Sequence, residues 1–483
     1  MKDTFYITSA IPYVNADPHI GTVMDPIQAD VLARYHRQRQ TATLLSAGTD
    51  VHGAKITEVA EGQGLEPQEL TEQISERMRL LFRRLNVSFD CFVRTSDPEH
   101  KRAAREIWRR LSADIYKSSY HGWYCVGCEE HVTQEDAREN DYVCPDHNRA
   151  YETIEEENYF FALSKYTQQI KDAITRDEYC IIPEKRKNEI LSLLDFGLQD
   201  VSFSRPKNKL SWGVEVPDDP EHVMYVWPDA LTNYLTATGF PDEGYDKWWP
   251  ADMHVIGKGI LRFHAAIWPG MLLAAGLPLP KQLFVHDYIT FNGDKMSKSQ
   301  GNFVAPSEVI DAYGTDALRY YLLHEVPSSN DGDFTWERLE TVYNSDLADD
   351  LGNLVHRVGA MIDKYQNGAI NPAGDPAHDI ADYHQAISEC RFEDGLDVVM
   401  GFVKDLNRYI EEEKPWEIAK TDGEHLGEVL SYLASNLAHA GWLLAPFLPE
   451  TGQAIYNAFS GEKLQPLEGP LFPKRSTSEE YSP

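Results

Sequence analysis

Cysteine is scarce in this chain, with only six among 483 residues, which is too few to form a disulfide framework. Long hydrophobic runs are missing as well, because no apolar stretch approaches the roughly 18–20 residues that a membrane span needs. The first four residues do not begin a signal-peptide pattern. These absences argue against a disulfide-stapled secreted domain and against an integral membrane protein. We therefore expect a cytoplasmic protein that does not associate with membranes.

Basic residues are also in short supply, since 45 lysines and arginines face 77 aspartates and glutamates, for a net charge of −32. A nucleic-acid-binding protein usually carries a basic surface patch. Any contact with RNA would therefore depend on local basic clusters, such as residues 101–110 or 185–187. The acidic excess indicates a well-solvated, self-repelling surface and by itself neither establishes nor excludes RNA binding.

The first part of the chain alternates between strand-like and helix-like runs. Residues 4–10 and 43–47 have the apolar character of buried strands, whereas residues 20–39 and 68–85 have helical periodicity. This alternation predicts a parallel sheet wound by helices. No Gly-x-Gly-x-x-Gly follows the first strand-like run, which disfavours a nicotinamide-binding enzyme.

The second part of the chain changes character. A strand at residues 254–257 leads into a helix at 260–275, and a strand at 284–291 leads into an Asn292-Gly293 turn, a strong hairpin signal. From about residue 339 onward, apolar residues recur at helical spacing, which predicts a helical bundle.

These patterns predict a Rossmann-like, doubly wound α/β fold with an insertion and a C-terminal α-helical bundle. The predicted segments are two halves of a catalytic domain (1–113 and 201–280), a connective insertion with a zinc knuckle (114–200), a linking region (281–337), a helical domain (338–472) and a loose tail (473–483).

Four residues of the insertion have the spacing of a zinc site. Cys125 and Cys128 are followed by Cys144 and His147, which gives C-x₂-C-x₁₅-C-x₂-H. Three thiolates and one imidazole complete a tetrahedral zinc site and leave no position for a catalytic water, so the prediction is one structural zinc. The alternative, ordinary buried cysteines with a surface histidine, does not explain the paired spacing.

Two short motifs indicate a phosphate-binding site. Pro18-His19-Ile20-Gly21 follows the first predicted strand and opens a helix, where free backbone N–H groups attract anions. Far downstream, Lys295-Met296-Ser297-Lys298-Ser299 places two ammonium groups on a segment of small residues that could grip a polyphosphate. A lone histidine is more often structural, but beside this lysine loop His19 could stabilise charge on an α-phosphate. Mg²⁺ would bridge the phosphate oxygens.

Other polar and aromatic residues remain ambiguous from the residues alone. Asp50 ends the second predicted strand, at the usual ligand crevice of a doubly wound sheet, and could pair with an ammonium group. Arg205 could bind a carboxylate, but either residue could equally be a surface charge. Four ring-bearing residues are spread over three segments of the chain. Such side chains usually pack in the core, and they would form a binding pocket only if they met at one site. The four are Tyr13, Trp227, Tyr234 and His264.

As an ordered pair, the two phosphate motifs are the signature of class I aminoacyl-tRNA synthetases. Within that class, the chain resembles the methionyl-tRNA synthetase family from Tyr6 to about Lys420. The landmarks are Ala10-Ile11-Pro12-Tyr13, Pro18-His19-Ile20-Gly21, Gly48-Thr49-Asp50, the cysteine and histidine set, Ser204-Arg205-Pro206-Lys207, Tyr225-Val226-Trp227-Pro228-Asp229-Ala230, Arg262-Phe263-His264, the lysine loop, Asp331-Gly332-Asp333-Phe334, Leu351-Gly352-Asn353-Leu354 and Lys414-Pro415-Trp416.

The resemblance implies ATP-dependent activation of methionine and its transfer to the 3′ end of tRNA(Met), whose anticodon is CAU. It implies a methionine site formed by Ala10, Ile11, Tyr13, Asp50, Arg205, Trp227, Ala230, Tyr234, Ile260 and His264. It implies that His19, Gly21, Thr22, Lys295, Ser297 and Lys298 bind ATP, and that His19, Thr22, Lys295 and Lys298 act in catalysis. It implies anticodon contacts from Asn353, Arg357, Pro415 and Trp416, and a monomer.

The chain departs from the family pattern at three positions. Thr22 stands where the family signature has a second histidine, Gly259 stands where an aspartate is usual, and Pro228 follows Trp227. Losing one preorganised donor commonly costs about 10²–10³ in rate. These departures leave two alternatives open. One is a relative that activates an amino acid without charging tRNA, and the other is a catalytically weak RNA-binding relative.

Overall fold

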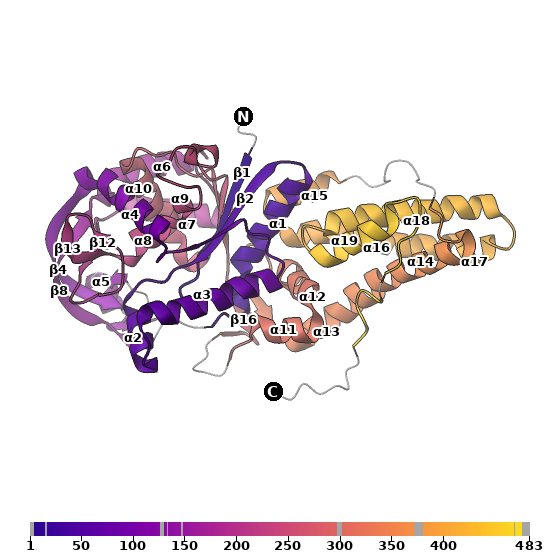
Figure 1. Cartoon of the computed structure of the whole chain (residues 1–483), viewed down its shortest axis with the longest axis horizontal. Helices are drawn as coiled ribbons and strands as arrows, with labels where there is room; N and C mark the ends of the chain where they lie inside the picture. The colour runs from indigo at the N-terminus through magenta and orange to yellow at the C-terminus, as the bar shows by residue number, and fades with distance from the viewer. Residues whose placement is uncertain are drawn as a thin grey trace. The chain divides into compact units, whose positions relative to one another are not determined.

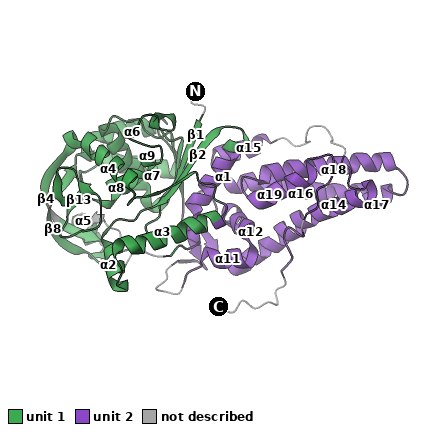
Figure 2. Ribbon diagram, in the orientation of Figure 1, with its two compact units in different colours: residues 1–18, 36–83, 87–286 green, residues 19–35, 84–86, 287–483 purple. Residues whose placement is uncertain are grey.

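A computed structural model describes residues 4–14, 17–125, 130–132, 134–145, 148–296, 302–370, 380–467 and 469–475. The chain divides into two compact units, shown in different colours in Figure 2. Unit 1 comprises residues 1–18, 36–83 and 87–286, and unit 2 comprises residues 19–35, 84–86 and 287–483. Each unit has its own core and its own set of predicted site residues.

Unit 1 is built on a six-stranded sheet with the order β3-β2-β1-β14-β15-β9, and all neighbouring strands are parallel. The strands are β1 (Thr4–Ser9), β2 (Ala42–Thr49), β3 (Cys91–Arg94), β9 (Cys180–Ile182), β14 (Met253–Gly257) and β15 (Gln282–His286). Consecutive strands run outward from β1 on one side, and the order switches to β14 on the other. Ligands bind beyond the carboxyl ends of the strands at such a switch point. The predicted doubly wound parallel sheet is confirmed.

The helices of unit 1 follow from apolar periodicity. In α4 (Pro98–Arg110), Pro98 occupies the first turn, where its missing N–H costs nothing, and the buried positions recur at helical spacing. One of these buried positions is His100, a polar residue within the core. The other principal helices are α2 (Ala54–Gln63), α3 (Pro67–Arg84), α6 (Thr167–Thr175), α7 (Glu184–Phe196), α8 (Val226–Leu231), α9 (Asn233–Thr236) and α10 (Trp268–Ala274).

Antiparallel strands form a second part of unit 1. They include β4 (Ile115–Cys125), β5 (Glu130–Val132), β8 (Glu152–Phe161) and β10 (Val201–Ser202), in the order β10-β8-β4-β5. A smaller sheet contains β11 (Ser204–Pro206), β13 (Asp219–Met224) and β12 (Glu215–Val216). The short strand β9 comes from within residues 114–200 but pairs with β15 in the parallel sheet. The boundaries of the six segments expected from the sequence stay a prediction.

The single strand predicted over residues 284–291 is wrong, because two strands in different sheets occupy this range. β15 ends at His286, and β16 (Ile289–Phe291) pairs with β17 (Asp294–Lys295) and β18 (Gly332–Phe334). The polar Asp287 interrupts the apolar run between them. The predicted hairpin is confirmed, because Asn292 and Gly293 have φ values of 52° and 82°, as a type I′ turn requires.

Unit 2 is mainly helical, and the predicted C-terminal bundle is confirmed. The long helices α14 (Asn353–Gln366), α16 (Phe392–Glu413), α18 (Gly423–Leu444) and α19 (Pro449–Phe459) pack against one another (Figure 1). The remaining helices of the unit include α1 (Met24–Gln38), α11 (Pro306–Tyr313), α12 (Thr315–Tyr320), α13 (Trp336–Val342), α15 (Ala381–Ser388) and α17 (Pro415–Ile418).

A buried arginine joins distant segments of unit 2. Arg319 of α12 is fully buried and donates to the carbonyl oxygens of Phe447 at 2.7 Å and Leu85 at 3.0 Å. It also forms an ion pair at 2.9 Å with Asp30 of α1, another fully buried residue. A charged pair of this kind is expensive to break, because the remaining partner would be left uncompensated. Arg319 therefore fixes α1 to the helical part of the chain.

Two further expectations concern the surface and the end of the chain. No helix within the described residues is long and apolar enough to cross a membrane. Residues 473–475 were expected in a loose tail, yet Tyr343 donates to the carbonyl oxygen of Pro473 at 3.0 Å and Lys474 pairs with Asp349 at 2.7 Å. Residues 476–483 lie outside the described part.

Candidate functional site

Residues at the ends of β1 and β2 form the floor of a candidate methionine site in unit 1. The backbone N–H of Asp50 donates to the carbonyl oxygen of Pro12 at 2.9 Å, and Val14 donates to the carbonyl oxygen of Asp50 at 3.1 Å. Tyr13 therefore lies directly beside Asp50 in a parallel bridge. Gly48 permits the close approach of β3 to this end of β2, because a Cβ added to it would lie 2.2 Å from the carbonyl oxygen of Val93. Asp50 itself is buried.

Tyr234, His264 and Ile260 form one connected group. His264 donates from Nδ1 to the carbonyl oxygen of Ile260 at 2.9 Å, so its Nε2 accepts from the hydroxyl of Tyr234 at 2.7 Å. Tyr6 in turn donates to the carbonyl oxygen of Tyr234 at 2.7 Å. This chain of hydrogen bonds fixes one tautomer of His264 and the orientation of the Tyr234 ring.

Trp227 and Ala230 lie on α8. The indole of Trp227 stacks on Phe263 with the ring centroids 3.4 Å apart, and it packs together with Tyr13 around one small aromatic cluster. Its Nε1 is buried and has no hydrogen-bond partner among the described residues. Pro228 is the third residue of α8, where the N–H would have no partner within the helix, so this departure does not break the helix.

The His254 ring, which packs beside Tyr234, carries no charge. Burial, with a smaller contribution from His264, lowers the pKa of His254 well below 6.5, so this ring stays neutral. Its ring nitrogens are bonded to Thr8 at 2.7 Å and to the indole of Trp268 at 3.2 Å. An uncharged aromatic wall of this kind suits a polarizable thioether.

Arg205 is already paired. Burial alone would lower its pKa, but the ring of Tyr124 and the carboxylate of Glu156 raise it above its ordinary value. Arg205 donates from Nη2 to Glu156 at 2.6 Å and from Nε at 3.2 Å, and its guanidinium lies 4.5 Å from the centre of the Tyr124 ring. Nη1 is not used in the pair with Glu156. The motifs did not reveal Glu156, which lies on a different strand.

A second feature that the motifs did not reveal is a buried carboxylate between two imidazoles. Asp229 of α8 is fully buried, and its two oxygens lie 2.6 Å from Nδ1 of His52 and 2.9 Å from Nε2 of His100. Burial alone would raise the pKa of Asp229, but the two histidines lower it to about 2. The signal was present in the sequence, because Asp229 is an acidic residue within an otherwise apolar helix.

In unit 2, His19 begins the helical segment that leads into α1. Its Nδ1 accepts from the N–H of Gly21 at 3.0 Å, and its own N–H donates to the hydroxyl of Thr22 at 3.3 Å. This reciprocal pair is a capping box at the start of η1 (Ile20–Val23). Gly21 is required, because a Cβ there would come within 2.9 Å of the His19 ring and 3.1 Å of Ile289.

The structure brings segments on either side of the lysine motif close to the helical segment that follows His19. Ile20 donates to the carbonyl oxygen of Val304 at 3.1 Å, and η1 contacts β16, the first strand of the hairpin whose second strand contains Lys295. Asp333 fixes the hairpin by accepting from the N–H of Gly293 at 2.9 Å. Ser297 and Lys298, which were predicted to bind ATP, lie outside the described residues.

The predicted anticodon residues lie on α14 and α17. Asn353 and Arg357 are one turn apart on α14, where Arg357 donates to Glu411 at 2.7 Å and Asn353 is exposed. Pro415 begins α17 and is buried, which orients the next residue outward. Trp416 is 36% exposed, which is high for so large a ring and leaves a face for stacking.

Two of the four predicted zinc ligands are described. Cys125 ends β4 and Cys144 lies in β6 (Val143–Cys144), and both are buried thiols rather than halves of a disulfide. The N–H of Asn148 donates to the carbonyl oxygen of Cys144 at 2.8 Å. Cys128 and His147 lie outside the described residues. The donors present fit zinc, because cysteine sulfur is a preferred ligand of structural zinc sites.

Another group in unit 2 could in principle hold a metal ion. His324, Glu325 and Asp346 offer ligand atoms close to one another, the one such group found among the described residues. Their charges are already compensated, because Glu325 pairs with Arg338 and His324, and Tyr320 donates to Asp346 at 2.9 Å. This group is therefore better described as an internal ionic network.

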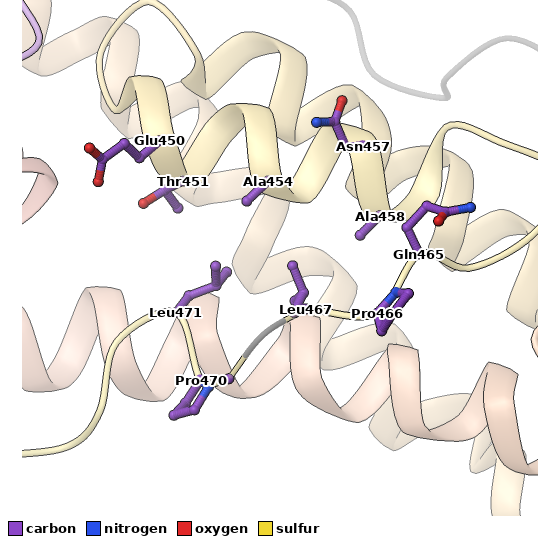
Figure 3. Close-up of a pocket in the computed structure, with 11 residues that line it drawn as sticks. Glu450, Thr451, Ala454, Asn457, Ala458, Gln465, Pro466, Leu467, Pro470 and Leu471 are labelled. Atoms are coloured by element: carbon purple, nitrogen blue, oxygen red, sulfur yellow. The ribbon is translucent and has the colours of Figure 1, made fainter.

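Unit 2 also contains two cavities, of about 470 Å³ and 460 Å³. Both are bordered by residues 465–467 and 469–471, and Figure 3 shows Leu467 and Leu471 facing Ala454 and Ala458 of α19. None of the predicted site residues lines either cavity.

Comparison with known proteins decides the family. The family model described as "tRNA synthetases class I (M)" matches residues 5–153 and 140–359. The chain belongs to the class I methionyl-tRNA synthetases. It is similar to a methionine–tRNA ligase of Thermotoga maritima, with 40% identity over 95% of this chain and 76% of the relative. A methionine–tRNA ligase of Brucella suis is 38% identical over the full length of both chains.

Solved structures of this synthetase family agree with the fold. The structure of Mycobacterium tuberculosis methionyl-tRNA synthetase in complex with methionyl-adenylate has a TM-score of 0.90 and 36% identity, and the match covers 98% of this chain and 100% of that one. The apo form of the same synthetase gives a TM-score of 0.83 with 33% identity.

Proposed function

We propose that this methionyl-tRNA synthetase binds methionine in unit 1 through the residues at the ends of β1, β2 and β14. Tyr234, His264 and Trp227 provide an uncharged aromatic wall for the thioether, where each sulfur–aromatic contact contributes roughly 0.3–1.5 kcal/mol. Asp50 holds the substrate ammonium. Arg205 faces the carboxylate through Nη1, the guanidinium nitrogen that its pair with Glu156 leaves unused.

Activation takes place when a carboxylate oxygen of methionine attacks the α-phosphorus of ATP, and pyrophosphate departs as methionyl-adenylate forms. Because Nδ1 of His19 accepts from Gly21, a neutral ring carries its proton on Nε2 and can donate it to a phosphate oxygen. Lys295 and Lys298 bind the departing pyrophosphate, and Mg²⁺ arrives with ATP and neutralises the phosphate charge. The contact between η1 and β16 supports this assignment most directly.

The methionyl group then passes to the terminal adenosine of tRNA, with release of AMP. Asn353, Arg357, Pro415 and Trp416 recognise the CAU anticodon, with an unpaired base stacked on the exposed indole. Replacing Trp416 by alanine removes this stacking surface, worth about 1–3 kcal/mol per base, whereas phenylalanine keeps a ring.

We expect Trp416→Ala to lower tRNA charging about 10-fold or more and to leave methionine-dependent ATP–pyrophosphate exchange unchanged. Trp416→Phe should retain most of the charging activity. Equal losses in both assays would contradict the anticodon assignment and indicate a folding defect.

Zinc holds the connective insertion through Cys125, Cys128, Cys144 and His147, and supplies folding energy without taking part in catalysis. The purified protein should carry about one zinc equivalent per chain by metal analysis. Cys144→Ser should reduce the zinc content and lower the melting temperature. A fully folded protein without zinc would rule out the structural metal.

The decisive experiment is ATP–pyrophosphate exchange with methionine and a panel of other amino acids, run beside tRNA(Met) charging. Exchange and charging with methionine would support the proposed steps and show that Thr22 and Gly259 are tolerated. Exchange without charging would favour a relative that delivers the amino acid elsewhere. Folded protein that is silent in both assays would favour a non-catalytic RNA-binding relative. The monomeric state and the cytoplasmic location remain predictions, and light scattering would test the first.

A further inference from the structure

The Asp229 carboxylate joins three separate segments of unit 1. Through Oδ2 it accepts from His52, two residues after Asp50, and through Oδ1 it accepts from His100 in the first turn of α4. Asp229 lies on α8, between Trp227 and the end of the helix. All three side chains are buried. A charged group in such a place must be compensated, because an unpaired buried charge is strongly destabilising.

The two histidines have different hydrogen-bonding roles. Nδ1 of His100 lies 3.0 Å from the hydroxyl of Thr236, which itself donates to the carbonyl oxygen of Thr232 at 3.1 Å. Nε2 of His100 donates to Asp229, and Nδ1 shares a hydrogen bond with the Thr236 hydroxyl. With a partner on each ring nitrogen, His100 is held between Asp229 of α8 and Thr236 of α9.

His52 contributes one hydrogen bond to the cluster. Its Nδ1 donates to Asp229, while its Nε2 is buried and has no hydrogen-bond partner among the described residues. The ring packs against Trp212 with a centroid distance of 5.3 Å, and the indole of Trp212 donates to the carbonyl oxygen of Val51 at 2.5 Å. His52 is thus held on one side by Trp212 and on the other by Asp229.

The cluster connects two parts of the proposed methionine site, the loop after β2 and helix α8. Within the part of the chain that the structure describes, no backbone hydrogen bond joins these two segments directly. The loop after β2 carries Asp50, and α8 carries Trp227 and Ala230. The hydrogen bond from His52 to Asp229 connects this loop with α8. We propose that Asp229 and His52 are positioning residues for methionine binding, which hold the Trp227 wall at a fixed distance from Asp50, with His100 as the second donor to Asp229. The inference rests on the proposed methionine site.

Two substitutions of His52 separate this role from a direct contact with substrate. Asparagine places an N–H donor near the position of Nδ1, and glutamine places one near the position of Nε2. If positioning through Asp229 is the role, His52→Asn should keep the methionine KM within about threefold of the unmodified chain. His52→Gln should raise it about 10-fold or more, the size expected for losing a hydrogen bond to a charged group.

The measurement is ATP–pyrophosphate exchange with the full chain, with methionine and ATP varied separately. A positioning role raises the methionine KM of His52→Gln and leaves the ATP KM within about twofold, whereas a general structural defect would change both. Asp229→Asn should show the same selective effect, and His52→Gln remains informative if Asp229→Asn does not fold.

The opposite order, with glutamine active and asparagine impaired, would overturn the proposal and identify Nε2 of His52 as a substrate contact. Two variants that both match the unmodified chain would overturn it as well. Exchange by the unmodified chain reports on the proposed function, and the difference between the two variants reports on positioning. The failure of one is therefore distinguishable from the failure of the other.

Discussion

Hydrogen bonds to the backbone decide the chemistry that His19 can perform. Its Nδ1 accepts from Gly21, and its N–H donates to Thr22, so the residue starts the helix and is oriented at the same time. A threonine at position 22 preserves the capping box that holds His19 in place. The family's second histidine is therefore replaced here by a residue that supports the first one structurally.

His19→Asn separates the capping role from the catalytic role. The asparagine oxygen can accept from Gly21 as Nδ1 does, because asparagine is a good helix N-cap, but no donor remains at the position of Nε2. We expect ATP–pyrophosphate exchange to fall about 10²–10³-fold with little change in melting temperature. A matched His19→Ala variant should lose about 1 kcal/mol of stability as well. An active His19→Asn protein would exclude donation from Nε2.

At the scale of elements, close packing of two helices in unit 2 depends on glycine. A Cβ added to Gly441 of α18 would lie 2.7 Å from the backbone nitrogen of Tyr456 and 2.9 Å from the carbonyl oxygen of Gly452, both in α19. Backbone atoms cannot move aside as a flexible side chain can. Gly401 of α16 is also a helical glycine, but no atom lies within 4 Å of its added Cβ.

The same substitution should therefore have opposite effects at these two positions. Gly441→Ala forces α18 and α19 apart and should destabilise the protein by about 1–3 kcal/mol. Gly401→Ala should stabilise it by about 0.5–1 kcal/mol, because alanine loses less entropy in a helix. Urea denaturation followed by circular dichroism measures both changes. Equal effects at the two positions would show that the helices are not in such close contact.

At the scale of the whole molecule, the net charge of −32 acts on every part of the fold. Like charges on a compact chain repel one another, and salt screens this repulsion as the Debye length falls from roughly 30 Å at 0.01 M to 3 Å at 1 M. The buried pairs, such as Arg319 with Asp30, lie inside the protein and are screened much less.

The melting temperature should therefore rise as potassium chloride increases from about 0.01 M to 1 M, the range over which screening changes most. Chloride is preferred to sulfate, because sulfate also strengthens apolar burial by exclusion from the surface. Differential scanning fluorimetry gives the melting temperature at each concentration. A constant or falling value would mean that surface ion pairs outweigh the repulsion.

Local features of the sequence predicted much of the fold and of the candidate site. The Asn292-Gly293 turn was predictable because positive φ values favour these two residues, and the helices followed from their apolar spacing. The short β9 was not, because three residues carry no recognisable pattern and its place in the sheet depends on pairing with β15. The break between β15 and β16 was missed because both segments are apolar.

The sequence by itself determined the family, the parallel sheet, the C-terminal helical bundle, and the positions that its motifs share with methionyl-tRNA synthetases, because these depend on residue type and spacing along the chain. Only the tertiary structure decided the partners of the buried charges. Glu156 pairs with Arg205, and Asp229 lies between two histidines from other segments. Such pairs form because a buried charge must find compensation in space, wherever in the sequence the partner lies.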